Sequence, residues 1–122
     1  MVTLTGDILA GQILTGDILW AELGPGRGRE QTGRRPVVVV SSNDYLAAVD
    51  SLLLIVPVTS RDRGWSNHVV LTGETALDHR SFAITEQVQS ISRDRIVGAA
   101  GSIDQDCLDR IRVYLRDFLD LW

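Results

Sequence analysis

The sequence predicts a small, mainly β domain in which short strands form a compact barrel and one helix follows at the C-terminus. Short apolar runs rich in β-branched residues recur between loops that contain glycine and proline. The last segment instead carries apolar residues at intervals of three and four, the spacing of a helix face. A chain of 122 residues suits one domain, and several closely spaced strands in so short a chain favour a barrel.

Composition limits the classes of protein to which the chain can belong. It is 44% hydrophobic and 23% charged, which argues against disorder. Its single cysteine, Cys107, cannot form an internal disulfide and suits a reducing cytosol, so we expect a cytoplasmic protein. The N-terminus lacks the features of a signal peptide, and the longest apolar run, Leu52–Val58, is too short to cross a membrane.

The N-terminus contains a repeat, because Leu4–Leu9 returns as Leu14–Leu19. One copy is enough to begin a strand, so we interpret the first copy as an extension outside the core or an upstream start. An edge strand is the alternative. We therefore expect residues 1–14 to be dispensable and residues 15–122 to form the domain.

The first strands flank a long loop. Ile18–Leu23 alternates as a strand does, with Trp20 expected in the core. Glycines interrupt the loop Gly24–Gly33, and the β-branched run Pro36–Val40 predicts a buried strand.

The middle of the chain predicts a short helix and further strands. Polar residues 42–44 offer an N-cap for a short helix or turn that ends at Val49. Leu52–Val58 predicts a second buried strand, in which Pro57 indicates an edge position or a bulge. Beyond a loop at Arg61–Asn67, short strands are predicted at His68–Leu71, Phe82–Ile84, Val88–Ile91 and Ile96–Ala100, with a loop containing glycine and threonine after the first of them.

The C-terminal segment predicts an amphipathic helix. Ser102 and Gln105 have the spacing of a capping box. One apolar stripe follows, and we expect all of it, including the last tryptophan, to pack on the barrel. Its members are Leu108, Ile111, Leu115, Phe118 and Trp122.

Charge is distributed unevenly along the chain. The net charge of −4 argues weakly against a nucleic-acid partner. All twelve basic side chains are nevertheless arginine, and four of them lie within nine residues of one another. These four, at the loop and the strand that follows it, are Arg27, Arg29, Arg34 and Arg35. Such a cluster suits contact with phosphate groups, and a solvated surface loop is the alternative.

Within this cluster, Arg35 has the most defined position. Pro36 disfavours a helical conformation for the residue before it, so Arg35 is expected to be extended at the mouth of a strand. Its guanidinium offers a planar fork of donors that matches a phosphate.

Two further polar segments lie on predicted strands. Thr59 and Ser60 follow directly on a buried strand. A rigid backbone at a strand end can position a hydroxyl for function, and the alternative is that the two residues only terminate the strand. Gln87 and Gln89 share a face by strand parity, so they could contact base edges or only cap the barrel.

Four segments are informative when taken together: Gly16–Trp20, Gly28–Gln31 with Gly33–Pro36, Val56–Ser60 and Glu86–Ile91. In order and spacing they resemble the MazF/PemK (Kid) toxins of bacterial toxin–antitoxin systems, from about Thr15 to Trp122. Arg29 departs from the family pattern, in which a small polar residue is common, and Arg34 replaces a residue that is frequently histidine.

The resemblance implies an SH3-like small β-barrel of the CcdB/PemK type that forms homodimers. It implies a metal-independent, sequence-specific endoribonuclease without a cofactor. The implied substrate is single-stranded RNA, which is mRNA in the main expectation and tRNA or rRNA in the alternatives. It also implies a MazE-like antitoxin that blocks the site with an acidic, largely disordered tail.

The resemblance further implies that Arg35 and Thr59 are catalytic. Without a metal, RNA is cut by its own 2′-hydroxyl, and a fixed arginine stabilises the charge that develops on the phosphate. Thr59 would bind the phosphate or orient the 2′-hydroxyl. Glu30 is a candidate general base, with a salt bridge that shapes the loop as the alternative.

The remaining site predictions concern RNA binding. Trp65 could stack on a base or pack against a dimer partner. His68 and His79 lie outside the family segments, so we do not assign them a role. The predicted RNA-binding residues are Arg27, Arg29, Gln31, Arg34, Ser60, Arg61, Trp65, Gln87 and Gln89.

Two other functions remain open at this stage. One is a non-catalytic gyrase-binding toxin of the CcdB type, which would act through the C-terminal helix and Trp122. The other is an SH3-like binding module, which would have no toxicity. The residues alone do not define the RNA sequence that is cut.

Overall fold

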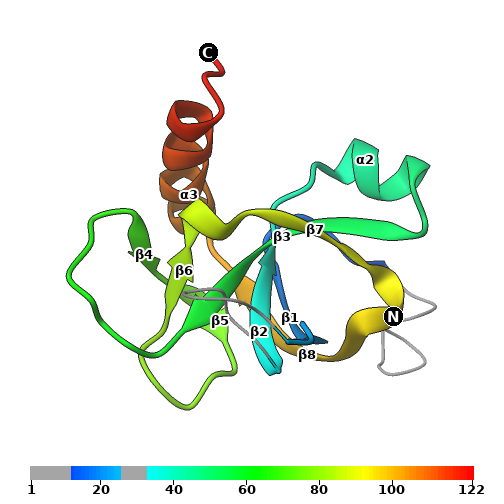
Figure 1. Ribbon diagram of the computed structural model, residues 1–122, viewed down its shortest axis with the longest axis horizontal. Coiled ribbons are helices and arrows are strands. Elements are labelled where there is room, and N and C mark those ends of the chain that lie inside the picture. The colour runs from blue at the N-terminus through cyan, green and yellow to red at the C-terminus, as the bar shows by residue number, and fades with distance from the viewer. Residues whose placement is uncertain (1–11, 26–32) are drawn as a thin grey trace.

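The computed structural model describes residues 12–25 and 33–122. These residues form one antiparallel sheet of eight strands that curls around the core, with a long helix across it (Figure 1). The strand path is β4-β6-β3-β2-β1-β8-β5, with β7 also paired to β3. The mainly β class and the C-terminal helix are therefore confirmed, although the path does not close and ends at β4 and β5.

The elements follow one another in short steps. They are β1 (Asp17–Glu22), β2 (Arg34–Val39), α2 (Asn43–Ala48), β3 (Leu52–Thr59), β4 (His68–Val70), β5 (Gly73–Thr75), β6 (Phe82–Ile84), a 3-10 turn (Thr85–Gln87), β7 (Gln89–Ser92), a second 3-10 turn (Arg93–Arg95), β8 (Ile96–Ile103) and α3 (Gln105–Phe118).

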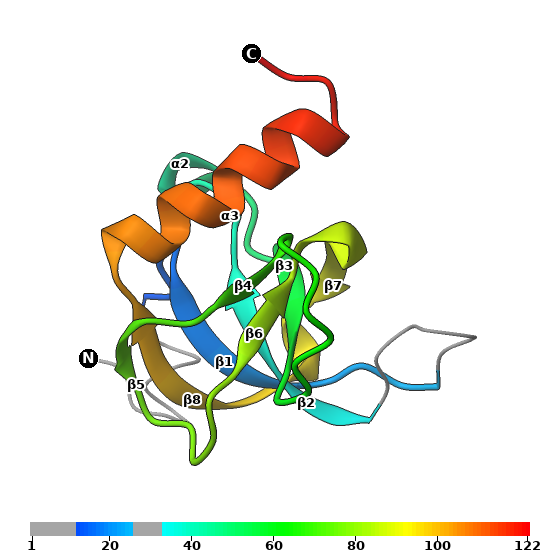
Figure 2. The same cartoon turned by 90° about the vertical axis from the view of Figure 1, so that its left-hand side faces the viewer.

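Neighbouring residues of the central strands face two different cores. Val37 and Ile55 belong to the core inside the curled sheet, whereas Val38 and Val56 belong to the core beneath α3. Because both faces of β2 and β3 are covered, these strands read as continuous apolar runs rather than alternating ones. Figure 2 shows α3 crossing the outside of the sheet near β4 and β6.

The prediction that Pro57 marks an edge or a bulge is wrong. β3 is an interior strand that pairs with β2 on one side and with β7 and β6 on the other. The pairing with β7 ends at Ile55 and the pairing with β6 begins at Val58. Pro57 lies between the two ladders, at the point where β3 changes partner, and its missing N–H is tolerated there.

The predicted helix start at residues 42–44 is confirmed. Ser42 is the N-cap of α2, and its hydroxyl accepts a hydrogen bond of 3.1 Å from the N–H of Tyr45. This bond satisfies one of the amides that the first turn of a helix leaves without a partner.

The predicted capping box of α3 is wrong by two residues. Ser102 lies in β8, and the N-cap is Asp104, whose carboxylate accepts from the N–H of Cys107 at 2.9 Å. The hydroxyl of Thr72 donates to the same carboxylate oxygen at 2.9 Å. These two bonds lower the pKa of Asp104, the bond from Cys107 most of all.

The apolar stripe of α3 packs only in its first half. Leu108 and Ile111 are buried and Leu115 is partly buried. Phe118 is 45% exposed and Trp122 fully exposed, so the expectation that the whole stripe packs is wrong for this chain taken alone. Among the described residues no helix has the length and apolarity needed to cross a membrane.

The second copy of the N-terminal repeat forms a turn that leads into β1. Gly16 has a φ of +89°, which favours glycine, and the carboxylate of Asp17 accepts from the N–H of Leu14 at 2.8 Å. The first copy lies outside the described residues. Ile13 is buried in the core, although the predicted boundary assigns it to the extension. The dispensability of residues 1–14 stays a prediction.

Candidate active site

The pairing of β2 with β3 brings the two predicted catalytic residues together. Val37 pairs with Pro57 and Val38 with Val56. Continuing this antiparallel register by two residues places Arg35 opposite Thr59. Both side chains then lie on the face that carries Val37, because successive residues of a strand alternate between faces.

The hydroxyl of Thr59 is held in a defined position. Thr59 is only 8% exposed, and its Oγ1 accepts a hydrogen bond of 3.1 Å from the N–H of Arg61. Because the amide occupies an acceptor position, the hydroxyl proton can donate to a neighbouring oxygen, such as one on a phosphate. The next residue, Ser60, is exposed and lies on the opposite face of the strand.

Arg34 makes an ion pair across the β1–β2 hairpin. Its Nε lies 2.8 Å from Oε2 of Glu22, and the two side chains are 63% and 45% exposed. An exposed pair of this kind contributes little to stability, roughly 0–1 kcal/mol. Separating Arg34 from Glu22 therefore costs little free energy, and the prediction that Arg34 contacts RNA stays a prediction.

The loop between β1 and β2 is anchored at its base. Gly33 accepts from the N–H of Leu23 at 2.9 Å and donates to the carbonyl of Gly24 at 3.1 Å. Both glycines have positive φ, +75° at Gly24 and +72° at Gly33, which allows this close approach. The other loop residues with predicted roles lie outside the described residues, so their roles stay predictions. They are Arg27, Arg29, Glu30 and Gln31.

Gln87 and Gln89 lie close together, but not for the predicted reason. Gln87 ends a 3-10 turn and Gln89 begins β7, so the two residues do not share one strand. A hydrogen bond of 3.3 Å from Nε2 of Gln89 to the carbonyl of Gln87 joins them instead. The strand predicted at Val88–Ile91 is shifted by one residue because the turn precedes it.

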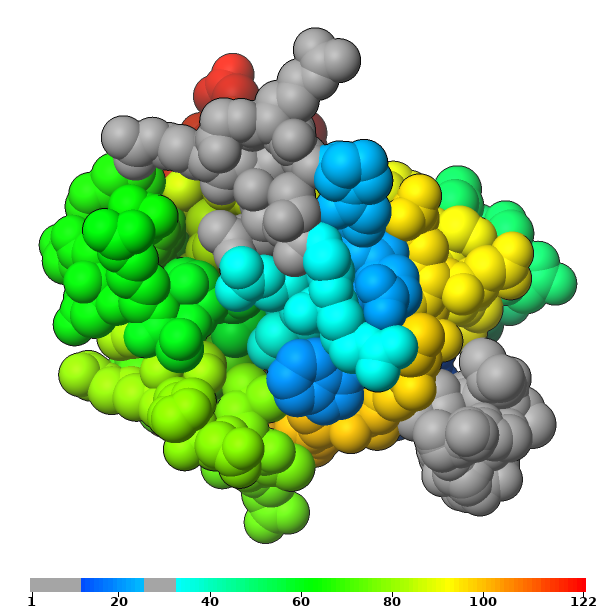
Figure 3. Space-filling view, turned by 60° about the horizontal axis from the view of Figure 1, so that its bottom comes forward, coloured from blue at the N-terminus to red at the C-terminus, as the bar shows by residue number. Residues whose placement is uncertain are grey.

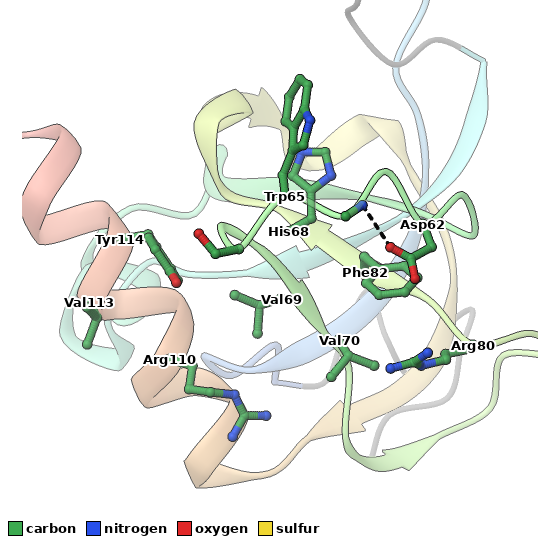
Figure 4. Close-up of a pocket in the computed structure, with 12 residues that line it drawn as sticks. Asp62, Trp65, His68, Val69, Val70, Arg80, Phe82, Arg110, Val113 and Tyr114 are labelled. Atoms are coloured by element: carbon green, nitrogen blue, oxygen red, sulfur yellow. Dashed lines mark hydrogen bonds between the residues drawn. The ribbon is translucent and has the colours of Figure 1, made fainter.

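The loop before β4 borders a pocket of about 460 Å³ between β4, β6 and α3 (Figure 4). Trp65 is 41% exposed, and its ring packs against the His68 ring at an interplanar angle of 47°, with the centroids 4.8 Å apart. The amide of Gly64 donates to Asp62 at 2.9 Å, which shapes the turn before it. Trp65 thus presents one side to solvent from a fixed position, and Arg61 lies on the same exposed loop.

A buried histidine and a carboxylate form a network that the sequence did not indicate. Nε2 of His68 lies 3.1 and 3.0 Å from the two carboxylate oxygens of Glu86, and Asn67 donates to Oε1 of Glu86 at 2.7 Å. A carboxylate only accepts, so Nε2 of His68 carries the proton. The residues are eighteen apart in the chain, and only the pairing of β4 with β6 brings them together.

No metal-ligand set is assigned. Within residues 12–25 and 33–122, no three or more His, Cys, Asp or Glu side chains lie together in a way that could hold a metal ion.

Comparison with known families gives a match over most of the chain. The family model described as "PemK-like, MazF-like toxin of type II toxin-antitoxin system" matches residues 14–119. The endoribonuclease toxin MazF of Escherichia coli K12 is 34% identical over 98 residues, covering 80% of this chain and 85% of that protein. The endoribonuclease MazF9 of Mycobacterium tuberculosis H37Rv is 33% identical over 113 residues, covering 88% and 96%.

Solved structures resemble the whole fold. MazF from Deinococcus radiodurans superimposes with a TM-score of 0.78 at 27% identity, covering 90% of this chain and 98% of that one. A MazE–MazF complex from the same organism gives 0.73 at 27% identity, covering 90% and 97%. The likeness therefore includes the curled sheet and its C-terminal helix.

Proposed function

The chain belongs to the PemK-like, MazF-like toxins of type II toxin–antitoxin systems, and from this premise we propose how it cuts RNA. As a member of that family it is an endoribonuclease toxin that an antitoxin controls. The substrate in our proposal is single-stranded RNA, cut at short sequences without a metal ion. The family match favours this activity over the gyrase-binding and adaptor alternatives.

Cleavage proceeds by attack of the RNA on itself. The 2′-oxygen forms a bond to the adjacent phosphorus as the bond from phosphorus to the 5′-oxygen breaks. The 2′-hydroxyl loses its proton to a base, and the leaving 5′-oxygen gains one. The products are a 2′,3′-cyclic phosphate and a 5′-hydroxyl. The protein must position the phosphate and stabilise the extra negative charge of the transition state.

Arg35 and Thr59 supply these two functions. Arg35 remains protonated at all ordinary pH values, so it serves as a fixed positive charge rather than as a base. Loss of one such donor typically raises the barrier by about 3–4 kcal/mol. Thr59 donates its hydroxyl proton to a phosphate oxygen or orients the 2′-hydroxyl. Glu30 remains our candidate for the base.

The observation that carries this proposal is the register of β2 and β3, which sets Arg35 against a buried threonine whose hydroxyl is already oriented by the backbone. Both residues lie at strand ends, where the backbone is rigid and the side chains can still reach a ligand.

The test uses purified protein and a mixed single-stranded RNA substrate in the presence of EDTA. We expect wild-type protein to cut and Arg35→Ala to lose at least about a hundredfold in rate. Arg93→Ala is the matched control, because Arg93 lies in the second 3-10 turn and donates to the carbonyl of Leu46. Loss of wild-type cleavage on chelation would exclude the metal-free mechanism, and full activity of Arg35→Ala would remove that residue from the site.

We further propose that two copies pair through the outer end of α3. Val113, Phe118 and Leu119 are all exposed there, at 56%, 45% and 54%. Single exposed apolar residues are ordinary, but several on the outer half of one helix are typical of an interface. A MazE-like antitoxin with an acidic tail is the second protein partner that we propose, and the cytoplasm is the compartment.

A further inference from the structure

A second pocket, of about 250 Å³, lies beside the proposed catalytic pair. It opens between the ends of the first three strands and the segment of residues 76–81. Figure 3 shows this side of the molecule, where the cyan atoms of β2 and the blue atoms of β1 meet the yellow-green atoms of that segment. Its lining includes Trp20, Arg34, Arg35, Ser60, Asp78 and His79.

One wall of the pocket is aromatic. Trp20 pairs with Pro36 on β2 and with Gly98 on β8. A Cβ at position 98 would lie 3.7 Å from Cδ1 of the indole, so the ring packs closely over the glycine. Trp20 packs against the core beneath α3, as predicted, and part of its side chain stays exposed. A flat, supported and accessible indole is a surface on which an unpaired base can stack.

The segment of residues 76–81 adds polar side chains to the lining. Asp78 and His79 are exposed and lie on the segment that covers the pocket. The hydroxyl of Ser81 donates to the carbonyl of His79 at 2.8 Å, which holds this segment in shape. The carboxylate of Asp78 can only accept hydrogen bonds, whereas Ser60 can both donate and accept.

We propose that this pocket binds a guanine of the RNA, next to the phosphate that contacts Arg35. The inference rests on the proposed function and names a specificity site for it. The volume is below the roughly 300–1,000 Å³ of pockets for drug-sized ligands, so it suits one base. Guanine presents two adjacent N–H donors on its Watson–Crick edge, which match the two oxygens of a carboxylate. Adenine, cytosine and uracil lack this pair of donors.

The position of Arg35 supports the same occupant. Arg35 lines the pocket and also lies opposite Thr59 at the ends of β2 and β3. Trp20 pairs with Pro36, so its indole lies on the strand face opposite to the one that carries Thr59. A nucleotide whose phosphate contacts the Arg35 guanidinium reaches Trp20 by passing around the exposed end of β2, where Arg35 lines the pocket. Arg34 and His79 add donors near the path of the backbone.

The first experiment maps cleavage sites. A random single-stranded RNA library is cut by wild-type protein, by Asp78→Asn and by the control Glu74→Gln, and the new 5′ ends are sequenced. Glu74 is an exposed acid on β5 that does not line the pocket. We expect wild type and the control to favour guanine at one position near the cut, and Asp78→Asn to lose at least about tenfold of that preference while still cutting.

The second experiment measures base binding without cleavage. In a Trp65→Phe/Trp122→Phe protein, Trp20 is the remaining tryptophan, and excitation at its red edge avoids the two tyrosines. We expect guanosine 5′-monophosphate to quench it more strongly than uridine 5′-monophosphate, and Asp78→Asn to abolish the difference.

The two experiments separate failure of this inference from failure of the proposed function. Unchanged guanine preference in Asp78→Asn, no guanine preference in wild type, or equal quenching by both nucleotides would overturn the inference. Absence of cleavage by wild type would instead overturn the proposed function, and the fluorescence titration would still decide whether the pocket binds guanine.

Discussion

Asp104 shows how one side chain can join several parts of the fold. Its carboxylate caps α3 through Cys107 and accepts from Thr72, which precedes β5. Its backbone N–H donates to the carbonyl of Thr72 at 2.9 Å. The helix start, the end of β8 and the edge strand therefore meet at one residue, and the ionised carboxylate is the form that these bonds favour.

The pKa of Asp104 predicts a dependence of stability on acid. Because hydrogen bonding lowers the folded pKa below 3.8, the folded state holds fewer protons than the unfolded state in this range. The contribution is present above the unfolded value and is lost as the pH falls through the folded value. We expect the free energy of unfolding of wild type, measured with urea, to fall relative to that of Asp104→Asn as the pH is lowered from about 5 to about 2. Parallel pH profiles of the two proteins would contradict this.

Other site residues differ in how far the sequence could predict them. Arg35 and Thr59 could be predicted because each has a local signal beside it. A proline follows Arg35, a buried strand precedes Thr59, and both residues lie in segments that match a family. His68 and Glu86 were not found, because their contact depends on the pairing of two three-residue strands distant in the chain. The pocket beside Arg35 was missed for a similar reason, since residues 76–81 carry no regular pattern and only the fold brings them to β1.

At the scale of elements, β5 and β8 show why one strand was missed. The sequence predicts a loop containing glycine and threonine after Leu71, where the structure has the short strand β5. It nonetheless pairs with the end of β8, and β8 runs to Ile103 rather than ending at Ala100. Gly101 has a φ of +92°, and a Cβ there would overlap the carbonyl of Glu74. The absence of a side chain permits this pairing, whereas propensity rules count glycine against a strand.

Gly101→Ala should therefore destabilise the fold through this strand pair. Strain at a positive φ and the overlap with Glu74 together predict a loss of about 1–3 kcal/mol in the free energy of unfolding. Gly98→Ala is the matched control, because its Cβ would meet Trp20 at an ordinary 3.7 Å and its φ is not positive. Urea denaturation of the two variants measures the effect, and equal stabilities would contradict the argument.

At the scale of the whole molecule, the amphipathic stripe of α3 extends beyond the surface that the sheet offers. Leu115 is still partly buried against the core, and the residues exposed beyond it include Phe118 and Trp122. Figure 2 shows the C-terminal end of α3 projecting past the sheet. The sequence predicted the stripe correctly but not its end, because a helical pattern does not distinguish packing within a chain from packing between chains.

The proposed dimer makes a prediction at this scale. Replacement of Val113 and Phe118 by aspartate should shift the protein from dimer to monomer in light scattering, because each charge would be buried without a partner. The matched control, Asp106→Asn/Asp109→Asn, changes exposed acids near the start of the same helix and should remain dimeric. A wild-type protein that is monomeric at all concentrations tested would contradict the proposal.

The central claim is that Arg35 and Thr59 act as one unit on a single phosphate, and a double-mutant cycle tests it most directly. The measurement is kcat/KM for one RNA substrate with wild type, Arg35→Ala, Thr59→Val and the double variant, with folding checked by circular dichroism. We expect each single variant to lose roughly 10²–10³-fold. The double variant should lose little more than the worse single variant, because groups that act together are not additive. Full activity of Thr59→Val, or losses that multiply in the double variant, would contradict the account.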